Sequence, residues 1–298
     1  MDPTEPQSMI KLTQPINILV QRRASIGDVI MTTGVVRELK RQYGANANID
    51  VATDYAEIYR NNPHIRNVFP VDQIPPVNNR YDIYHNLDDA YELNPYTNYL
   101  DAYFYRVFGS ANTHDKSVEL FDTNEDKTPI DGKYVVVHLR NWHWQAKNIS
   151  MDTWFDVFVK VFEVDPNIKI VCVGGSTDYF LEHPNFVDAR NKTSQQIKSL
   201  CDGAQCFVGI DSGPFWCASA SRTHIIGVLT HLLPERVMPW RKHDYMYNAT
   251  AIQTREDCAG CNDRQTRPIR QIICEKTDFP CTRNFDTTAI ADAILKTL

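Results

Sequence analysis

The sequence predicts an α/β fold made of two domains, each with a mostly parallel sheet covered by helices. The chain has 298 residues, too many for one ordinary core and comfortable for two domains of about 150 residues each. Short apolar runs of β type alternate with segments of helical periodicity over most of the chain. A polar stretch rich in turn residues, 113–133, separates two such series.

Composition indicates an ordinary globular protein. Hydrophobic residues make up 43% of the chain, the net charge is −6 and the pI is about 5.8, which argues against a surface that coats nucleic acid. No apolar run approaches the roughly 20 residues that span a bilayer. The polar N-terminus has no signal-peptide core. We expect a soluble, cytoplasmic protein without a transmembrane segment, whose residues 1–14 form a flexible tail.

The first half reads as an N-terminal domain over residues 15–130. Its helical periodicity is clearest over two segments, 29–43 and 99–108, and a short helix at 56–61 is stopped by Asn62-Pro63. Expected strands are 16–20, 49–53, 68–71 and 81–87. Strands that alternate with helices in this way favour a parallel sheet.

The second half repeats the pattern over residues 131–285. Expected helices are 152–162 and 193–201, and expected strands are 134–139, 168–173, 207–210 and 223–229. The last segment, 286–298, has an Asp/Thr cap and apolar residues at helical spacing, and we expect a helix that packs back onto the first domain. Two such units predict two Rossmann-like domains that face each other across a cleft.

A strand-to-helix turn at 207–216 is the stretch that most favours a ligand. Asp211 and Ser212 are good N-cap residues, Gly213 lets a backbone come close, and Pro214 suits the first helical turn. Free N–H groups at a helix start favour an anion, typically phosphate. Ligands of open α/β sheets also lie at the carboxyl ends of the strands. A capped turn without a ligand remains the alternative interpretation.

A second loop of the same kind follows the first strand, Ser25-Ile-Gly-Asp28. Gly27 permits a tight turn, and Asp28 lies at the helix start, where a carboxylate is electrostatically favoured. Taken alone, Asp28 is an ordinary capping residue.

Five loops together resemble those of the heptosyltransferase-like glycosyltransferases of family 9, which have the GT-B architecture of two Rossmann-like domains. In chain order they are Ser25-Ile-Gly-Asp28 for S-x-G-D, Lys147 ahead of a tryptophan-containing helix, Gly174-Gly175 with Asp178 for G-G-x-x-[DE], Asp211-Ser-Gly-Pro214 for D-[ST]-G-P-x-H, and Pro239-Trp240 for P-W. The resemblance runs from about residue 16 to the C-terminus. Trp216 replaces the final His of the fourth motif, so a donor contact by that His does not carry over. The region 72–133 matches only loosely, so the acceptor does not carry over either.

The resemblance implies transfer of a sugar from a nucleoside-diphosphate donor to a hydroxyl acceptor, with inversion. That reaction needs a base for the acceptor hydroxyl and a group that stabilises the leaving diphosphate. By resemblance, Asp28 is the expected base, in an acceptor-side loop with Ser25 and Gly27. The expected donor-binding residues are Lys147, Gly174, Gly175, Asp211, Ser212, Gly213 and Pro214. The sequence has no Asp-x-Asp triplet, so we expect catalysis without a metal ion or other cofactor.

Two other functions stay open. One is a glycosyltransferase whose acceptor is a nucleic-acid base or another polyanion, which an Arg-rich loop with Arg255, Arg264, Arg267 and Arg270 would attract. The other is a non-catalytic protein that binds nucleotide sugars. The sequence identifies neither the donor sugar and nucleobase nor the acceptor.

Four of the eight cysteines crowd into the same Arg-rich loop: Cys258, Cys261, Cys274 and Cys281. The first two have the C-x-x-C spacing of metal ligands, but the second pair is separated by six residues, which is wide for a zinc knuckle. In a reducing compartment a structural zinc or four free thiols are the main options. We expect a structural and not a catalytic role for this cluster.

Overall fold

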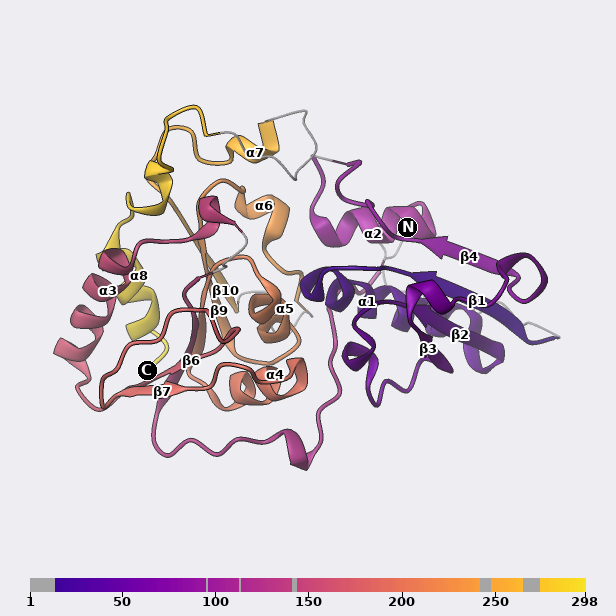
Figure 1. Cartoon of the computed structure of the whole chain (residues 1–298), viewed down its shortest axis with the longest axis horizontal. Helices are drawn as coiled ribbons and strands as arrows, with labels where there is room; N and C mark the ends of the chain where they lie inside the picture. Colours follow the sequence, from indigo (N-terminus) through magenta and orange to yellow (C-terminus); the bar gives the residue numbers. More distant parts are fainter. Residues whose placement is uncertain (1–13, 95, 113, 141–143, 242–247, 265–273) are drawn as a thin grey trace, which may run out of the picture.

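The computed structural model has two α/β domains that lie side by side along the long axis of the molecule (Figure 1). It describes residues 14–94, 96–112, 114–140, 144–241, 248–264 and 274–298. Nearly all of the tail predicted for residues 1–14, and also Arg267 and Arg270, lie outside these ranges. The predicted class, α/β with two parallel sheets, is confirmed.

The first sheet has the order β3-β2-β1-β4, and all its strand pairs are parallel. Its central strand is buried on both faces, because Ile18, Leu19 and Val20 are all fully covered. The strands are β1 (Ile16–Gln21), β2 (Ala47–Ala52), β3 (Asn67–Phe69) and β4 (Ile83–Asn86), and the helices are α1 (Ile26–Tyr43) and α2 (Tyr99–Phe108). The helix predicted at 56–61 is only a 3-10 turn, Ala56–Tyr59.

The second sheet has the order β10-β9-β8-β5-β6-β7, again with parallel pairs throughout. Its strands are β5 (Tyr134–His138), β6 (Lys169–Cys172), β7 (Phe186–Asp188), β8 (Cys206–Gly209), β9 (His224–Leu229) and β10 (Ala249–Gln253). The helices are α3 (Met151–Val164), α4 (Ser194–Gly203), α5 (Gly213–Ser219), α6 (Pro234–Val237), α7 (Cys261–Arg264) and α8 (Thr287–Leu295). The two edge strands, β7 and β10, were not predicted, because one is very short and the other is only half-buried.

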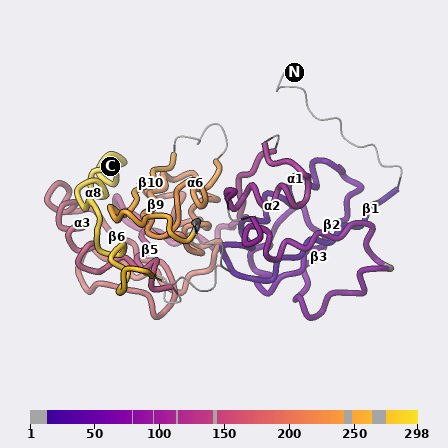
Figure 2. Tube along the Cα trace, turned by 90° about the horizontal axis from the view of Figure 1, so that it is seen from above, coloured from indigo at the N-terminus to yellow at the C-terminus, as the bar shows by residue number. Residues whose placement is uncertain are grey.

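The last helix, α8, packs on the second domain, so the expectation that it returns to the first domain is wrong. Ile290 and Ile294 are fully buried in the same core as Val157 and Phe158 of α3. Both views place α8 beside α3 at the end of the molecule away from the first domain (Figures 1 and 2). Burial of this apolar face against α3 accounts for the position of α8, and a backbone hydrogen bond of 2.8 Å from Arg255 N–H, just after β10, to the Asn284 carbonyl ties the preceding segment to the same domain.

The two domains meet through α1 and α5, which lie against each other between the sheets (Figure 1). Gly27 makes this approach close, because a Cβ there would lie 2.8 Å from Cδ1 of Trp216. From the other side, a Cβ on Gly213 would lie 3.3 Å from Ile26. Within the described part of the chain, no helix is both long and apolar enough to cross a membrane.

Candidate functional site

The candidate residues lie at the carboxyl ends of strands in both sheets. In each sheet the strand order reverses at one point, between β1 and β4 in the first and between β5 and β8 in the second. Such points are where open α/β sheets bind ligands. Asp28 follows β1, and Asp211 and Ser212 follow β8. The topology therefore brings loops far apart in sequence to two neighbouring ligand-binding positions.

Asp28 is the third residue of α1 and closes a capping box with Ser25. Its Oδ2 accepts hydrogen bonds from the Ser25 N–H at 2.9 Å and the Ser25 hydroxyl at 3.2 Å. The same oxygen accepts from Nη2 of Arg22 at 2.8 Å, whereas Oδ1 accepts from the Tyr91 hydroxyl at 3.0 Å. Only 12% of the side chain is exposed. The capping role is thus present, and it holds the carboxylate in one orientation.

Arg22, which the sequence suggested only as part of a basic cleft with Arg23 and Lys147, organises the surroundings of Asp28. It is buried after β1, and its Nη1 donates to the carbonyl of Leu87 at 3.1 Å. Its Nη2 donates to Glu92 at 3.0 Å as well as to Asp28. Although burial disfavours the charge, Tyr103, Asp28 and Glu92 together raise the pKa of Arg22 above its usual value. The sequence signal was an arginine directly after a buried strand.

In the second domain, Lys147 and Asp211 form an ion pair. The Lys147 Nζ lies 2.6 Å from Oδ2 of Asp211 and donates to its carbonyl at 3.2 Å. The other oxygen, Oδ1, accepts from Nε1 of Trp216 at 3.2 Å. Trp216, which stands in place of the expected His, therefore orients Asp211 and packs over Gly27 at the same time.

A buried histidine, His138, ties two of the predicted loops together. Its Nδ1 lies 2.9 Å from the Ser212 hydroxyl, and its Nε2 lies 3.2 Å from Oδ2 of Asp178. Asp178 also accepts from the Gly175 N–H at 2.7 Å. Burial works against ionisation of Asp178, but the bonds from His138 and Gly175 hold the pKa of this carboxyl below its usual range. The sequence reasoning passed over His138; its place at the end of a central strand was the available signal.

The glycines and the cap do what their positions predict. Gly174 has a φ of +135°, and a Cβ there would lie 2.3 Å from the Asp178 carboxylate. Ser212 caps α5, accepting a 3.4 Å bond from the Phe215 N–H, and Pro214 lies in the first turn. These features shape the loops that follow β6 and β8.

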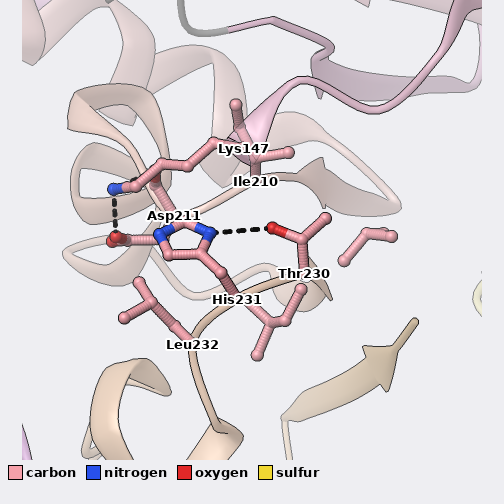
Figure 3. A pocket seen from close by; sticks show the side chains of 8 residues that line it. Lys147, Ile210, Asp211, Thr230, His231 and Leu232 are labelled. Carbon is pink, nitrogen blue, oxygen red and sulfur yellow. Dashed lines mark hydrogen bonds and ion pairs between the residues drawn. The ribbon is translucent and has the colours of Figure 1, made fainter. Parts of the chain in front are cut away.

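A small pocket beside the ion pair contains a second buried histidine, His231 (Figure 3). Its Nδ1 lies 3.0 Å from the Thr230 hydroxyl and 3.2 Å from the Ala146 carbonyl. Burial, with Lys147 as the next cause, lowers the pKa of His231 to about 3. The pocket volume of about 10 Å³ holds about one water molecule and no nucleotide. It is lined by Lys147, Ile210, Asp211, Val228, Leu229, Thr230, His231 and Leu232.

The four cysteines of the Arg-rich loop lie near one another. Burial raises the pKa of the Cys281 thiol to about 12, and Cys261, Cys258 and Cys274 add to the rise. Within the described residues, the group whose ligand atoms all approach within 4.8 Å of one another is Glu256, Asp257 and Cys258. No disulfide joins any of the cysteines in the described part of the chain. They share a neighbourhood, but their sulfurs are not drawn together at metal-ligand distances.

No protein-family model matches the chain, and no curated protein matches its sequence. Solved structures do match. A glycosyl transferase of family 9 from Veillonella parvula DSM 2008 has a TM-score of 0.73 at 14% identity, over 97% of this chain and 99% of that one. The iron-containing dodecameric glycosyltransferase TibC from enterotoxigenic E. coli H10407 has a TM-score of 0.72 at 17% identity, over 96% and 79%. E. coli ADP-heptose lps heptosyltransferase II has a TM-score of 0.61 at 13% identity, over 86% and 96%.

These likenesses establish the fold. The chain has the GT-B architecture of family 9 glycosyltransferases, as the five loops predicted. Two of the similar proteins were solved with donor or donor analogue: TibC with ADP-D-β-D-heptose, and the E. coli heptosyltransferase WaaC with ADP-2-deoxy-2-fluoro heptose.

Proposed function

We propose that this protein is an inverting glycosyltransferase that moves a sugar from a nucleoside-diphosphate donor to a hydroxyl acceptor without a catalytic metal. One observation carries the proposal. The loop that holds Asp28 in the first domain packs against the helix that follows Asp211 and Ser212 in the second, with Gly27 against Trp216. A base and a donor-binding turn on opposite domains is the arrangement that direct transfer between two bound substrates requires.

Asp28 is the proposed base. Its Oδ1 accepts one bond, from Tyr91, so a lone pair remains for the acceptor hydroxyl. The acceptor oxygen attacks the anomeric carbon of the donor and its proton passes to Asp28. The bond from the anomeric carbon to the diphosphate breaks, and the nucleoside diphosphate leaves with the electron pair. A single carboxylate suffices, because no enzyme nucleophile takes part.

The leaving diphosphate needs positive charge, which we assign to Lys147 and to the backbone N–H groups at the start of α5. Lys147 already faces this turn through its ion pair with Asp211. A bound diphosphate carries more negative charge than the Asp211 carboxylate. The Lys147 ammonium would therefore move from Asp211 to the diphosphate. Ser212, Gly213 and Pro214 form the turn itself, and Gly174 and Gly175 complete the donor side.

The donor to test first is ADP-heptose, because two proteins of this fold were solved with it or with an analogue. A thermal-shift screen should compare it with UDP-, GDP- and CDP-linked sugars, with and without EDTA. A ligand at about 100 times its dissociation constant stabilises the folded state by roughly 2.7 kcal/mol, which is readily measured. If none of the four nucleotide classes binds, the proposal fails.

Two variants separate binding from chemistry. Asp28→Asn should bind donor normally but lose turnover, measured as nucleoside-diphosphate release, by about 100-fold or more. Lys147→Ala should chiefly weaken donor binding.

Near-normal turnover in Asp28→Asn would remove Asp28 as the base. Donor binding without turnover on any acceptor would favour a non-catalytic nucleotide-sugar-binding protein. Turnover only with polyanionic acceptors would favour the nucleic-acid alternative.

We also propose that Cys258, Cys261, Cys274 and Cys281 hold one structural metal ion. Four thiols from one loop are the donor set of a tetrahedral zinc or iron centre. The other three cysteines of the loop lie close enough to Cys281 to raise the pKa of its thiol. The glycosyltransferase TibC, whose structure is similar to that of this chain, contains iron. For this role we place the protein in the cytoplasm, where thiols stay reduced.

Metal analysis of the purified chain tests this site. We expect about one equivalent of zinc or iron, lost in Cys258→Ser and Cys281→Ser and retained in Cys172→Ala, a buried cysteine of β6. Wild-type protein free of both metals would show that the loop is held by packing and hydrogen bonds alone.

A further inference from the structure

The base Asp28 shares its ion-pair partner with a second carboxylate. Nη2 of Arg22 has two hydrogens, and the structure directs one to Asp28 at 2.8 Å and the other to Glu92 at 3.0 Å. Glu92 comes from the segment after β4, on the other side of the point where the sheet order reverses. Two carboxylates therefore face each other across one buried guanidinium group.

The two carboxylates are held very differently. Asp28 accepts from four donor groups, whereas Glu92 accepts from Arg22 through Oε1. Its other oxygen, Oε2, is buried and has no partner among the described residues. Burial raises the pKa of Glu92, and Arg22 opposes that rise. The backbone N–H of Glu92 also opposes the rise, but with Oε2 unbonded the Glu92 carboxylate is less well compensated by hydrogen bonds than that of Asp28.

The groups around Arg22, Asp28 and Glu92 do not neutralise the negative charge of Glu92 through a direct ion pair. Tyr91 and Tyr103 stack on the Arg22 guanidinium at 5.5 and 5.6 Å, and burial raises the pKa of both phenols well above the usual value, so they stay neutral. Asp88, the other charged group that acts on Tyr103, is also acidic. From the second domain, Trp216 approaches Gly27 without a charge, whereas the Arg236 cation packs on Tyr99 and donates to the carbonyls of Asn94 and Thr97. Among the three groups that bond directly, Arg22, Asp28 and Glu92, there are two carboxylates and one guanidinium group.

We propose that Glu92 is a positioning residue that keeps Asp28 basic despite the ion pair with Arg22. With Arg22 alone, Asp28 would form a balanced pair and would be a poor base. With Glu92 present, a proton taken up by Asp28 removes excess negative charge and leaves Arg22 paired with Glu92. The inference rests on the proposed function, in which Asp28 takes the acceptor's proton.

The test is a carboxylate NMR titration of protein labelled with carbon-13 at the aspartate side chains, with the Asp28 signal assigned by its loss in Asp28→Asn. Glu92→Gln keeps the size and an acceptor oxygen but removes the charge. We expect its Asp28 signal to titrate about one pH unit lower than in wild type, a tenfold lower proton affinity. Glu92→Asp keeps the charge, so its Asp28 signal should titrate close to the wild-type pH. This variant provides the comparison with wild type if Glu92→Gln folds poorly.

The matched control is Glu125→Gln, the same change at an exposed carboxylate, which should leave the Asp28 titration unchanged. A second arm follows nucleoside-diphosphate release from ADP-heptose against pH, where the acidic limb should move to lower pH in Glu92→Gln. An Asp28 titration identical in Glu92→Gln and Glu125→Gln overturns the inference. Full turnover in Asp28→Asn would instead overturn the proposed function, since the NMR result does not depend on activity.

Discussion

At the scale of single residues, the structure separates local roles from site roles. Asp28 is both a cap and the proposed base, because the capping box fixes Oδ2 and leaves Oδ1 toward Tyr91. His138 was missed, although it joins the Asp178 turn to the cap of α5. Sequence patterns identify caps well, since capping depends on neighbours in the chain. They do not identify a histidine whose partners lie 40 and 74 residues away.

A second residue-scale consequence concerns His231, which the fold keeps neutral. Its pKa is about 3 when folded, against about 6.5 unfolded, so the unfolded chain binds the extra proton as the pH falls below 6.5. The folded state therefore loses stability from this group between pH 6.5 and pH 3. From pH 7 to pH 5 the loss is about 2 kcal/mol.

We predict that His231→Gln removes that part of the acid sensitivity. The glutamine amide can still donate to the Ala146 carbonyl but does not titrate. Urea unfolding of both proteins at pH 7 and pH 5 is the measurement, since all other groups titrate equally in the two. Equal losses of unfolding free energy would show that His231 gains its proton in the folded state.

At the scale of elements, alternation of strands and helices was enough to predict both sheets. Helix α2 was predicted with its observed bounds, because Asn98 caps it and Gly109 ends it in the left-handed conformation. The strands β7 and β10 were missed because edge strands bury less and carry a weaker apolar signal. For α8, the amphipathic pattern predicted that a helix forms but not which domain it packs against. Its position follows from burial against α3 and from contacts such as the bond between Arg255 and Asn284, 29 residues apart, that no local pattern contains.

At the scale of the whole molecule, the two domains share one hydrophobic core cluster, and hydrogen bonds such as Gln195 to the Glu57 carbonyl and Asn98 to the Met238 carbonyl also cross between them. Trp216 packs over Gly27 and donates to Asp211, so one side chain connects the loop of the proposed base in one domain with the proposed donor-binding loop of the other. Within this shared surface, Trp216 on Gly27 and Ile26 on Gly213 are the close contacts between α1 and α5 that a substitution can probe.

We predict that Gly27→Ala destabilises the protein by about 1–3 kcal/mol and lowers turnover. The added Cβ would lie 2.8 Å from Cδ1 of Trp216, so the helices must separate or the indole must move. Urea unfolding and nucleoside-diphosphate release measure the two effects. In a Trp216→Ala background the same substitution should cost little, because the atom it meets is gone. An equal cost in both backgrounds would mean that the interdomain contact is not the cause.

The sequence by itself determined what depends on near neighbours and periodicity: two parallel α/β domains, the capped turns after β1 and β8, the glycines of the Asp178 turn, and through five loops the GT-B fold. Tertiary structure alone decided which distant side chains meet. It placed Arg22 between Asp28 and Glu92, His138 between Ser212 and Asp178, and α8 on α3. The physical reason is that capping and periodicity act over a few residues, whereas burial and ion pairing act between any groups that the strand order brings together.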